Sequence, residues 1–259
     1  MKLTFDRNLF TQIGLDSGSL TMLAGVTHRF LEPGQYRGVV YKGKDSIGDF
    51  YINVDKNSPV AQANIDLAAF EASPSVPDAS GSSSSPGSDC SCQGKGTATA
   101  GTKFELNPKG YAVFHVTEGA GGYAVRVGKA AEDPKQQNQF DSHELKSEDI
   151  FSGVILRPGT YSSTNALGSK GKGKITVSYP QAGKTAYHPP NPVTVKCSER
   201  GFEPDHVEIQ PGQAVVFHVA APARIKVELV KADDGPGKRR EHVRPGWKKV
   251  AHPEQKKKS

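Results

Sequence analysis

Two histidines and a cysteine are the residues of this 259-residue chain best suited to metal chemistry. His115 and His218 are the last residue but one of two similar segments, FELNPKGYAVFHV (104–116) and VEIQPGQAVVFHV (207–219). Imidazole nitrogens and a thiolate bind transition metals, so His115, His218 and Cys197 form one candidate metal site. Strand alternation offers another interpretation, in which both histidines point outward between Phe and Val neighbours that face a core.

An acid–base cluster is a second candidate for chemistry. Asp141, His143 and Glu144 lie together around Ser142, but a similar segment has Asp16-Ser17-Gly18-Ser19 and lacks His and Glu. No nucleophile elbow, phosphate loop or zinc-protease helix motif occurs. Cys90-Ser91-Cys92 has poor spacing for zinc or a redox pair. We therefore expect no enzyme activity and no cofactor.

Positive charge is concentrated at the C-terminus. The formal net charge is +6, but residues 238–259 alone carry +7 and the rest of the chain carries −1. Basic segments attract nucleic acid or acidic proteins through counterion release and steering. A solubilising end is the alternative. The candidate anion- or partner-binding residues are Lys238, Arg239, Arg240, Arg244, Lys248, Lys249, Lys256, Lys257 and Lys258.

The elements that would position these residues are β-strands. Apolar and polar residues alternate over 50–54, 175–177 and 225–229, and Pro-Gly pairs at 33–34, 158–159 and 211–212 are typical of turns. Short strands with regular turns predict β-sandwiches rather than βαβ units. A short helix is expected at 58–70, where Ser58 could cap it and Pro59 suits the first helical position.

An internal duplication organises the sequence. LDSGSLTMLAGVTHRFLEPGQY (15–36) matches FDSHELKSEDIFSGVILRPGTY (140–161) without a gap, and the segments 104–116 and 207–219 also match. The chain reads as a back half (15–54), a front and back half (104–177), and a front half (207–230). Unpaired halves would expose a strand edge and an apolar face, so the terminal halves should find each other, within one chain or between chains.

This order predicts an all-β protein of two sandwiches, the outer one permuted or strand-exchanged. Residues 102–180 form the complete central sandwich, and the outer sandwich combines 1–57 with 193–232. Three connecting or terminal segments complete the division: a short helix and Ser/Gly-rich linker (58–101), a Pro-rich spacer (181–192) and a basic disordered tail (233–259).

The strand motifs resemble the cupredoxin fold, although an immunoglobulin-like sandwich also fits them. Gly201-Phe202-Glu203-Pro204 and the segment 207–217 are similar to the opening strands of that family, and 156–161 with 171–177 to its closing strands. The resemblance implies a copper site of two His, a Cys and usually a Met. The corresponding loops, 162–170 and 37–47, contain none of these residues, so copper electron transfer is not expected.

These observations favour a non-enzymatic structural or assembly protein whose basic tail docks on an acidic partner. Two alternatives stay open: a nucleic-acid-binding protein that acts through the tail, and a metal-binding protein that uses His115, His218 and Cys197. The expected partners are a protein or further copies of the chain. No run of about 18 apolar residues occurs, so we expect no membrane span. Residues 1–18 lack the apolar core of a secretory signal, so we expect a cytoplasmic location, or packaging in an intracellular assembly or virion.

Overall fold

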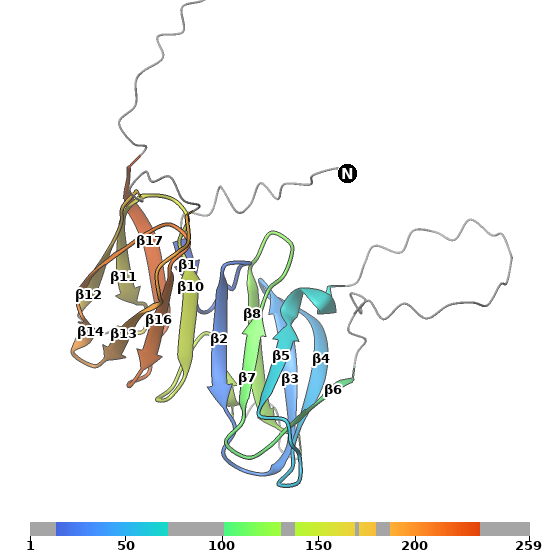
Figure 1. The fold of residues 1–259 in the computed structure, drawn as a ribbon. Coiled ribbons are helices and arrows are strands. Elements are labelled where there is room, and N and C mark those ends of the chain that lie inside the picture. The colour runs from blue at the N-terminus through green and yellow to red at the C-terminus, as the bar shows by residue number, and fades with distance from the viewer. Residues whose placement is uncertain (1–13, 72–100, 131–137, 169–170, 180–186, 234–259) are drawn as a thin grey trace, which may run out of the picture.

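The computed structural model describes residues 14–71, 101–130, 138–168, 171–179 and 187–233, and confirms the all-β prediction (Figure 1). In these ranges the single helical segment is the 3-10 turn η1 (Leu67–Phe70). No helix there has the length and apolar character that crossing a membrane requires. The strands are β1 (Gly14–Asp16), β2 (Ala24–Arg29), β3 (Gly34–Lys42), β4 (Asp45–Val54), β5 (Gln62–Asp66), β6 (Thr102–Leu106), β7 (Tyr111–His115), β8 (Tyr123–Lys129), β9 (Asn138–Asp141), β10 (Ile150–Val154), β11 (Gly159–Asn165), β12 (Lys172–Val177), β13 (Val193–Ser198), β14 (Gly201–Glu203), β15 (His206–Ile209), β16 (Ala214–Val219) and β17 (Ile225–Ala232).

The strands form three sheets. One five-stranded sheet has the order β6-β4-β3-β8-β9, and another has the order β1-β17-β11-β12-β15. The third sheet has seven strands in the order β14-β13-β16-β10-β2-β7-β5, which run side by side across both halves of the molecule (Figure 1). We call the half that contains β2–β8 sandwich 1 and the half that contains β10–β17 sandwich 2.

The seven-stranded sheet is continuous through both sandwiches because β2 pairs antiparallel with β10. Directly paired residues point to the same side of a sheet. One row of paired residues on the inner side is almost fully buried along its whole length, so both five-stranded sheets cover that same side. This row consists of Ile65, Phe114, Val26, Phe151, Phe217 and Val195.

The duplication is visible in three dimensions. Tyr36 in β3 donates its hydroxyl hydrogen to the carbonyl oxygen of Glu32 at 2.9 Å, and its sister residue Tyr161 in β11 does the same to Arg157 at 2.8 Å. Each repeat therefore contributes eight equivalent strands: β1–β8 in the first and β9, β10–β13 and β15–β17 in the second.

The first strand of each repeat lies in the sheet of the other repeat. β1 pairs with β17 of sandwich 2, with Leu15 opposite Val227, whereas β9 pairs with β8 of sandwich 1, with Phe140 opposite Val127. After each of these strands the chain crosses to its own sandwich. The two repeats of one chain thus exchange their first strands reciprocally.

The strand pairing differs from the predicted division of the chain. Most of the segment 15–54 pairs with 102–129 to form sandwich 1, through β3–β8, β4–β6 and β2–β7. The segment 150–177 pairs in the same way with 206–232. Residues 102–180 therefore do not close a central sandwich by themselves, and the predicted pairing of the chain ends is found for β1 and β17.

The reason lies in the connections. The pairs β4–β6 and β5–β7 are parallel, and a parallel pair needs a long connection between its strands. The segment between β5 and β6 supplies that length in sandwich 1, and residues 178–205 supply it for the parallel pair β12–β15 in sandwich 2.

The helix predicted at 58–70 is wrong over most of its length. Gln62–Asp66 is strand β5, which pairs parallel with β7, and only Leu67–Phe70 forms a 3-10 turn. Ala63, Ile65 and Leu67 are buried at alternating positions. Burial in this segment therefore has period two, which is typical of a strand and not of a helical face.

The predicted connectors are described only in part. Residues 72–100 of the linker and 181–186 of the spacer lie outside the described ranges. The second part of the spacer contacts sandwich 2: Gln213 donates a side-chain hydrogen bond to the carbonyl of Asn191 at 2.7 Å, and the Tyr187 hydroxyl donates to Pro211 at 2.8 Å.

Candidate functional site at the junction of the sandwiches

The two crossings are held by matching backbone contacts. Ser17 donates its backbone N–H to Ile225 at 3.0 Å and accepts from the Ile225 N–H through its hydroxyl oxygen at 3.2 Å. Ser142 makes the same two contacts with Val125, both at 3.0 Å. Each serine is fully buried, so every polar group of this contact needs its partner.

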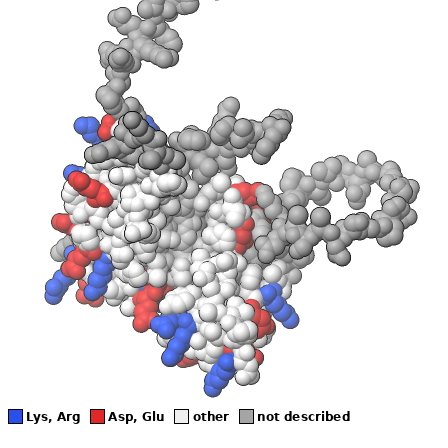
Figure 2. All heavy atoms as spheres, in the orientation of Figure 1, with Lys and Arg blue, Asp and Glu red and all other residues white. Residues whose placement is uncertain are grey.

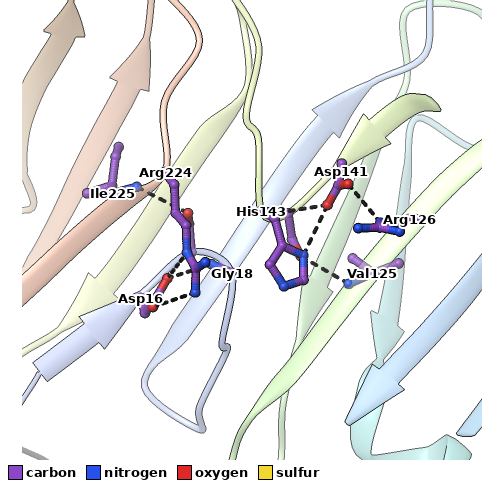
Figure 3. Close-up of polar contacts among 10 residues, drawn as sticks. Asp16, Gly18, Val125, Arg126, Asp141, His143, Arg224 and Ile225 are labelled. Atoms are coloured by element: carbon purple, nitrogen blue, oxygen red, sulfur yellow. Dashed lines mark hydrogen bonds and ion pairs between the residues drawn. The ribbon is translucent and has the colours of Figure 1, made fainter. Parts of the chain in front are cut away.

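A carboxylate anchors each crossing (Figure 3). Asp16 accepts hydrogen bonds from Nε and Nη2 of Arg224 at 3.0 and 2.9 Å, and Asp141 accepts one from Nε of Arg126 at 2.8 Å. Each carboxylate also accepts the backbone N–H two residues later, from Gly18 or His143, at 2.9 Å. These charge-assisted bonds fix the angle at which the chain leaves the exchanged strand.

The pKa of Asp141 lies below its ordinary value. Burial raises this pKa, but the hydrogen bonds from His143 and the positive charge of Arg126 lower it by more. Asp141 is therefore a carboxylate at neutral pH, and it accepts hydrogen bonds from Arg126 and His143. These contacts hold the crossing, which explains the presence of an aspartate in the predicted acid–base cluster.

A buried His–Asp pair occurs at the junction. Nδ1 of His28 lies 2.6 Å from Oδ1 of Asp149, and the two residues are 8% and 2% exposed. The His28 ring packs against Phe30 and Phe140, with ring centroids 4.8 and 5.0 Å apart. Its Nε2 is buried and has no hydrogen-bond partner. The pair links β2 to the residue before β10 and thus joins the two sandwiches beneath their shared sheet.

A polar groove of about 590 Å³ lies beside this pair. It is open to solvent through exposed residues of the segment between β9 and β10, including Glu148, whose φ is +75°. Because Nε2 of His28 is shielded from solvent, the pair does not offer a base to a molecule in the groove. The groove is lined by His28, Arg29, Leu31, Gln139, Asp141, Glu144, Lys146, Ser147, Glu148 and Asp149.

The predicted metal-site residues do not come together. His115 and His218 lie on the outer side of the seven-stranded sheet, three strands apart, which is about 14 Å. Cys197 lies on the inner side of β13 and is 1% exposed, and burial raises its pKa to about 11. In the described ranges no group of three or more His, Cys, Asp or Glu residues could hold a metal ion.

The nine predicted partner-binding residues lie outside the described residues, as do Cys90 and Cys92. The tail therefore stays a prediction. His115 and His218 do follow the strand interpretation, because their neighbours Phe114, Val116, Phe217 and Val219 are buried and both histidines face outward.

Sequence reasoning missed the His28–Asp149 pair. The apolar alternation of Ala24, Val26 and Phe30 places residue 28 on the inner side of a strand, where a histidine needs a partner. That signal was available. The identity of the partner was not, because Asp149 is 121 residues away and its sister position in the first repeat is Ala24.

Comparisons with known proteins return no match, whether the chain is compared with protein-family models, with curated proteins or with solved structures.

Proposed function

We propose that this chain is a non-enzymatic structural or assembly protein whose basic tail docks on an acidic partner. The observation that carries the proposal is the junction. One seven-stranded sheet and two exchanged strands join the sandwiches into a single body, whereas a two-domain enzyme usually keeps a mobile cleft between its domains.

The chemistry around the strands supports a scaffold. The sandwiches are cupredoxin-like in this proposal, and the loops that correspond to the copper-binding loop of that family lack Cys, His and Met. Asp16, Ser17, Asp141 and Ser142 at the junction are engaged in holding the crossings. Function in such a body depends on surfaces and attached segments rather than on a catalytic centre.

The distribution of charge supports docking through the tail. Figure 2 shows Lys, Arg, Asp and Glu side chains toward the ends and edges of the sandwiches, with both signs present. Without residues 238–259 the chain carries a formal charge of −1, so the body itself has little attraction for a polyanion.

A comparison of two triple variants tests the proposal. Binding of the full chain to immobilised poly-glutamate is measured against a variant with Lys256, Lys257 and Lys258 changed to Gln. The matched control changes three exposed lysines of the body, Lys103, Lys172 and Lys174, to Gln. We expect the tail variant to bind on the order of tenfold more weakly and the control to bind as the unchanged chain does.

Two results would overturn the proposal. One is equal weakening by both triple variants. The other is a strong preference for a mixed-sequence nucleic acid over poly-glutamate at the same salt concentration, which would favour the nucleic-acid-binding alternative.

A further inference from the structure

The seven-stranded sheet ends differently in the two sandwiches (Figure 1). Ile65 of β5 lies opposite Phe114. Val195 of β13 lies opposite Phe217, the sister residue of Phe114, so β5 and β13 are equivalent strands. In sandwich 2 the chain after β13 turns back as β14 and pairs with residues 196–198. In sandwich 1 the chain after β5 forms the η1 turn instead, and β5 is the last strand of the sheet among the described residues.

The free edge of β5 presents backbone groups that no described strand binds. Tyr111 donates its N–H to the carbonyl oxygen of Ala61 at 2.9 Å, so alternate residues from 61 to 65 turn their backbone groups toward β7. The backbone N–H and C=O groups of Gln62, Asn64 and Asp66 therefore point away from the sheet. Such a row is a template for one more strand.

The equivalent edge of β13 is protected against pairing, whereas the edge of β5 is not. Proline has no N–H to donate, and Lys196 already lies opposite Glu203 of β14. A proline, a lysine and a covering strand all keep a sheet edge from pairing with another chain. The edge-facing residues of β5 and their counterparts are Gln62 and Pro192, Asn64 and Thr194, and Asp66 and Lys196.

The join between the two sandwiches shows how an open edge of this fold pairs. β2 and β10 are sister strands, and Val26 lies directly opposite its own sister residue Phe151 in an antiparallel pair. The flanking residues are exchanged, because Gly25 lies opposite Ser152, which is the sister of Thr27. The repeats are thus joined edge to edge through equivalent strands about an approximate twofold axis, which is the isologous arrangement of symmetric dimers.

We propose that two copies of this chain join at β5 in the same way, with β5 of one copy antiparallel to β5 of the other. A twofold axis at Asn64 places the two Asn64 residues opposite each other and Gln62 opposite Asp66 of the second copy. All three edge-facing residues of each copy then exchange backbone hydrogen bonds with the other copy. This register also keeps the two Asp66 residues apart, and each Asp66 carboxylate already accepts the N–H groups of Ala68 and Thr117 at 3.0 and 3.2 Å.

The assembly closes at two copies. Pairing through β5 doubles the seven-stranded sheet and leaves β14 at both of its ends. β14 has three residues, and Pro204 follows it directly, so it is a poor template for a further strand. The contact of one short strand per copy is small beside the roughly 800 Å² per partner of a stable interface, so we expect a reversible dimer. This dimer goes beyond tail docking and does not depend on it.

A matched pair of lysine variants tests the proposal in the full chain. Asn64→Lys places two lysines opposite each other on the twofold axis, and Thr194→Lys makes the same change at the exposed sister position in β13. Sedimentation equilibrium is measured from about 1 μM to about 500 μM. We expect the unchanged chain and Thr194→Lys to rise from 27.7 kDa to twice that mass and no further. Asn64→Lys should require at least about tenfold higher concentration.

Amide hydrogen exchange at residues 62, 64 and 66 shows what binds the edge. We expect these three amides to exchange at least about tenfold more slowly as the concentration rises through the association range. The amide of Thr194 should show no such change. Slow exchange of the three amides already at the lowest concentration would overturn the proposal, because a segment of the same chain would then occupy the edge.

Three sedimentation results would also overturn the proposal: a mass of 27.7 kDa at every concentration, equal loss of association in both lysine variants, and growth beyond two copies. Far-UV circular dichroism shows whether each variant keeps its strands. Gln62→Pro replaces Asn64→Lys if the latter does not fold, since the N–H that it removes does not bind β7.

The variant with Lys256, Lys257 and Lys258 changed to Gln is run alongside and should associate as the unchanged chain does. Association that disappears in this variant but survives Asn64→Lys would overturn the proposal, because the tail would then hold the copies together. Loss of poly-glutamate binding without loss of association would separate tail docking from the β5 dimer, which the second result alone would support.

Discussion

The two crossings share their backbone contacts but fill the space beneath them differently. In sandwich 1 the exchanged strand brings Phe140 onto His28, which is paired with Asp149. In sandwich 2 the exchanged strand brings Leu15 onto Gly153, where a Cβ atom would lie 2.3 Å from Leu15 Cδ1. His28 and Gly153 are sister positions of the duplication, as are Phe140 and Leu15.

This difference shows what the exchange requires. The serine contacts that direct the chain are the same at both crossings, and each aspartate accepts from an arginine and from the backbone N–H two residues later, so these contacts define the exchange. The packing beneath differs in volume: a pair of rings fills one crossing and a leucine over a glycine fills the other.

Replacing Asp149 by its sister residue tests the larger filling. Asp149→Ala removes the acceptor of His28 Nδ1 and of the Lys146 backbone N–H, and leaves a buried imidazole without a partner. We expect a loss of about 2–4 kcal/mol in the free energy of unfolding, measured by urea denaturation. The matched variant Ala24→Ser changes the sister position and should shift the free energy of unfolding by less than about 1 kcal/mol in either direction. Equal losses would contradict the difference between the crossings.

Adding a methyl group at Gly153 tests the smaller filling. Gly153→Ala forces Leu15 to move, and we expect a loss of about 1–3 kcal/mol in the free energy of unfolding. Combining it with Leu15→Ala restores the space, so the double variant should lose less than the sum of the two single losses. Simple additivity in thermal or urea denaturation would show that the two residues do not compete for volume.

The aspartates of the two crossings can be compared by pH. Since the pKa of Asp141 is lowered in the folded protein, its carboxylate stabilises the fold above its ordinary pKa of about 3.9, and that contribution is lost as pH falls through the folded value. Asp141→Asn should therefore lose about 1–2 kcal/mol at pH 7 and show a shallower decline in acid. Urea denaturation at pH 7, 5 and 3 measures both effects, with Asp16→Asn as the sister variant. An unchanged acid decline in Asp141→Asn would contradict the prediction.

The labelling rates of buried thiols in the two sandwiches test whether the sandwiches open together. Burial raises the pKa of Cys197 to about 11, so in a Cys90→Ser/Cys92→Ser background we expect slow labelling by a thiol reagent at pH 8. Ile65 pairs with Phe114 as Val195 pairs with Phe217, so Leu67 and Cys197, each two residues later, are equivalent positions. Leu67 is also fully buried. A thiol introduced by Leu67→Cys, with Cys197→Ser, should react at a similar slow rate. A large difference in rate would show that one sandwich opens by itself.

The local structure followed from the sequence wherever alternation was clear. Phe50, Ile52 and Val54 in β4 and Ile175 and Val177 in β12 are buried as predicted, because period two fixes which side of a sheet a residue occupies. The helix prediction for 58–70 was wrong because the alanines of this segment fit a helix and a strand equally well, and pairing with β7 favours the strand.

The long-range pairing could not be predicted in the same way. The duplication identified the matching halves, but the choice between a following and a preceding partner depends on connection length and strand direction. The contact between Asp16 and Arg224 joins residues 208 positions apart, and the local sequence around either residue does not identify its partner.

The exchanged β1 has a consequence for synthesis on the ribosome. Leu15 precedes all the other strands of the sheet that it joins, and its partner strand β17 ends at Ala232. Sandwich 1 also needs Phe140 from the second repeat to cover its core. Sandwich 1 therefore has all of its strands once β9 has been made, whereas the nascent chain must keep β1 unpaired until β17 has been made.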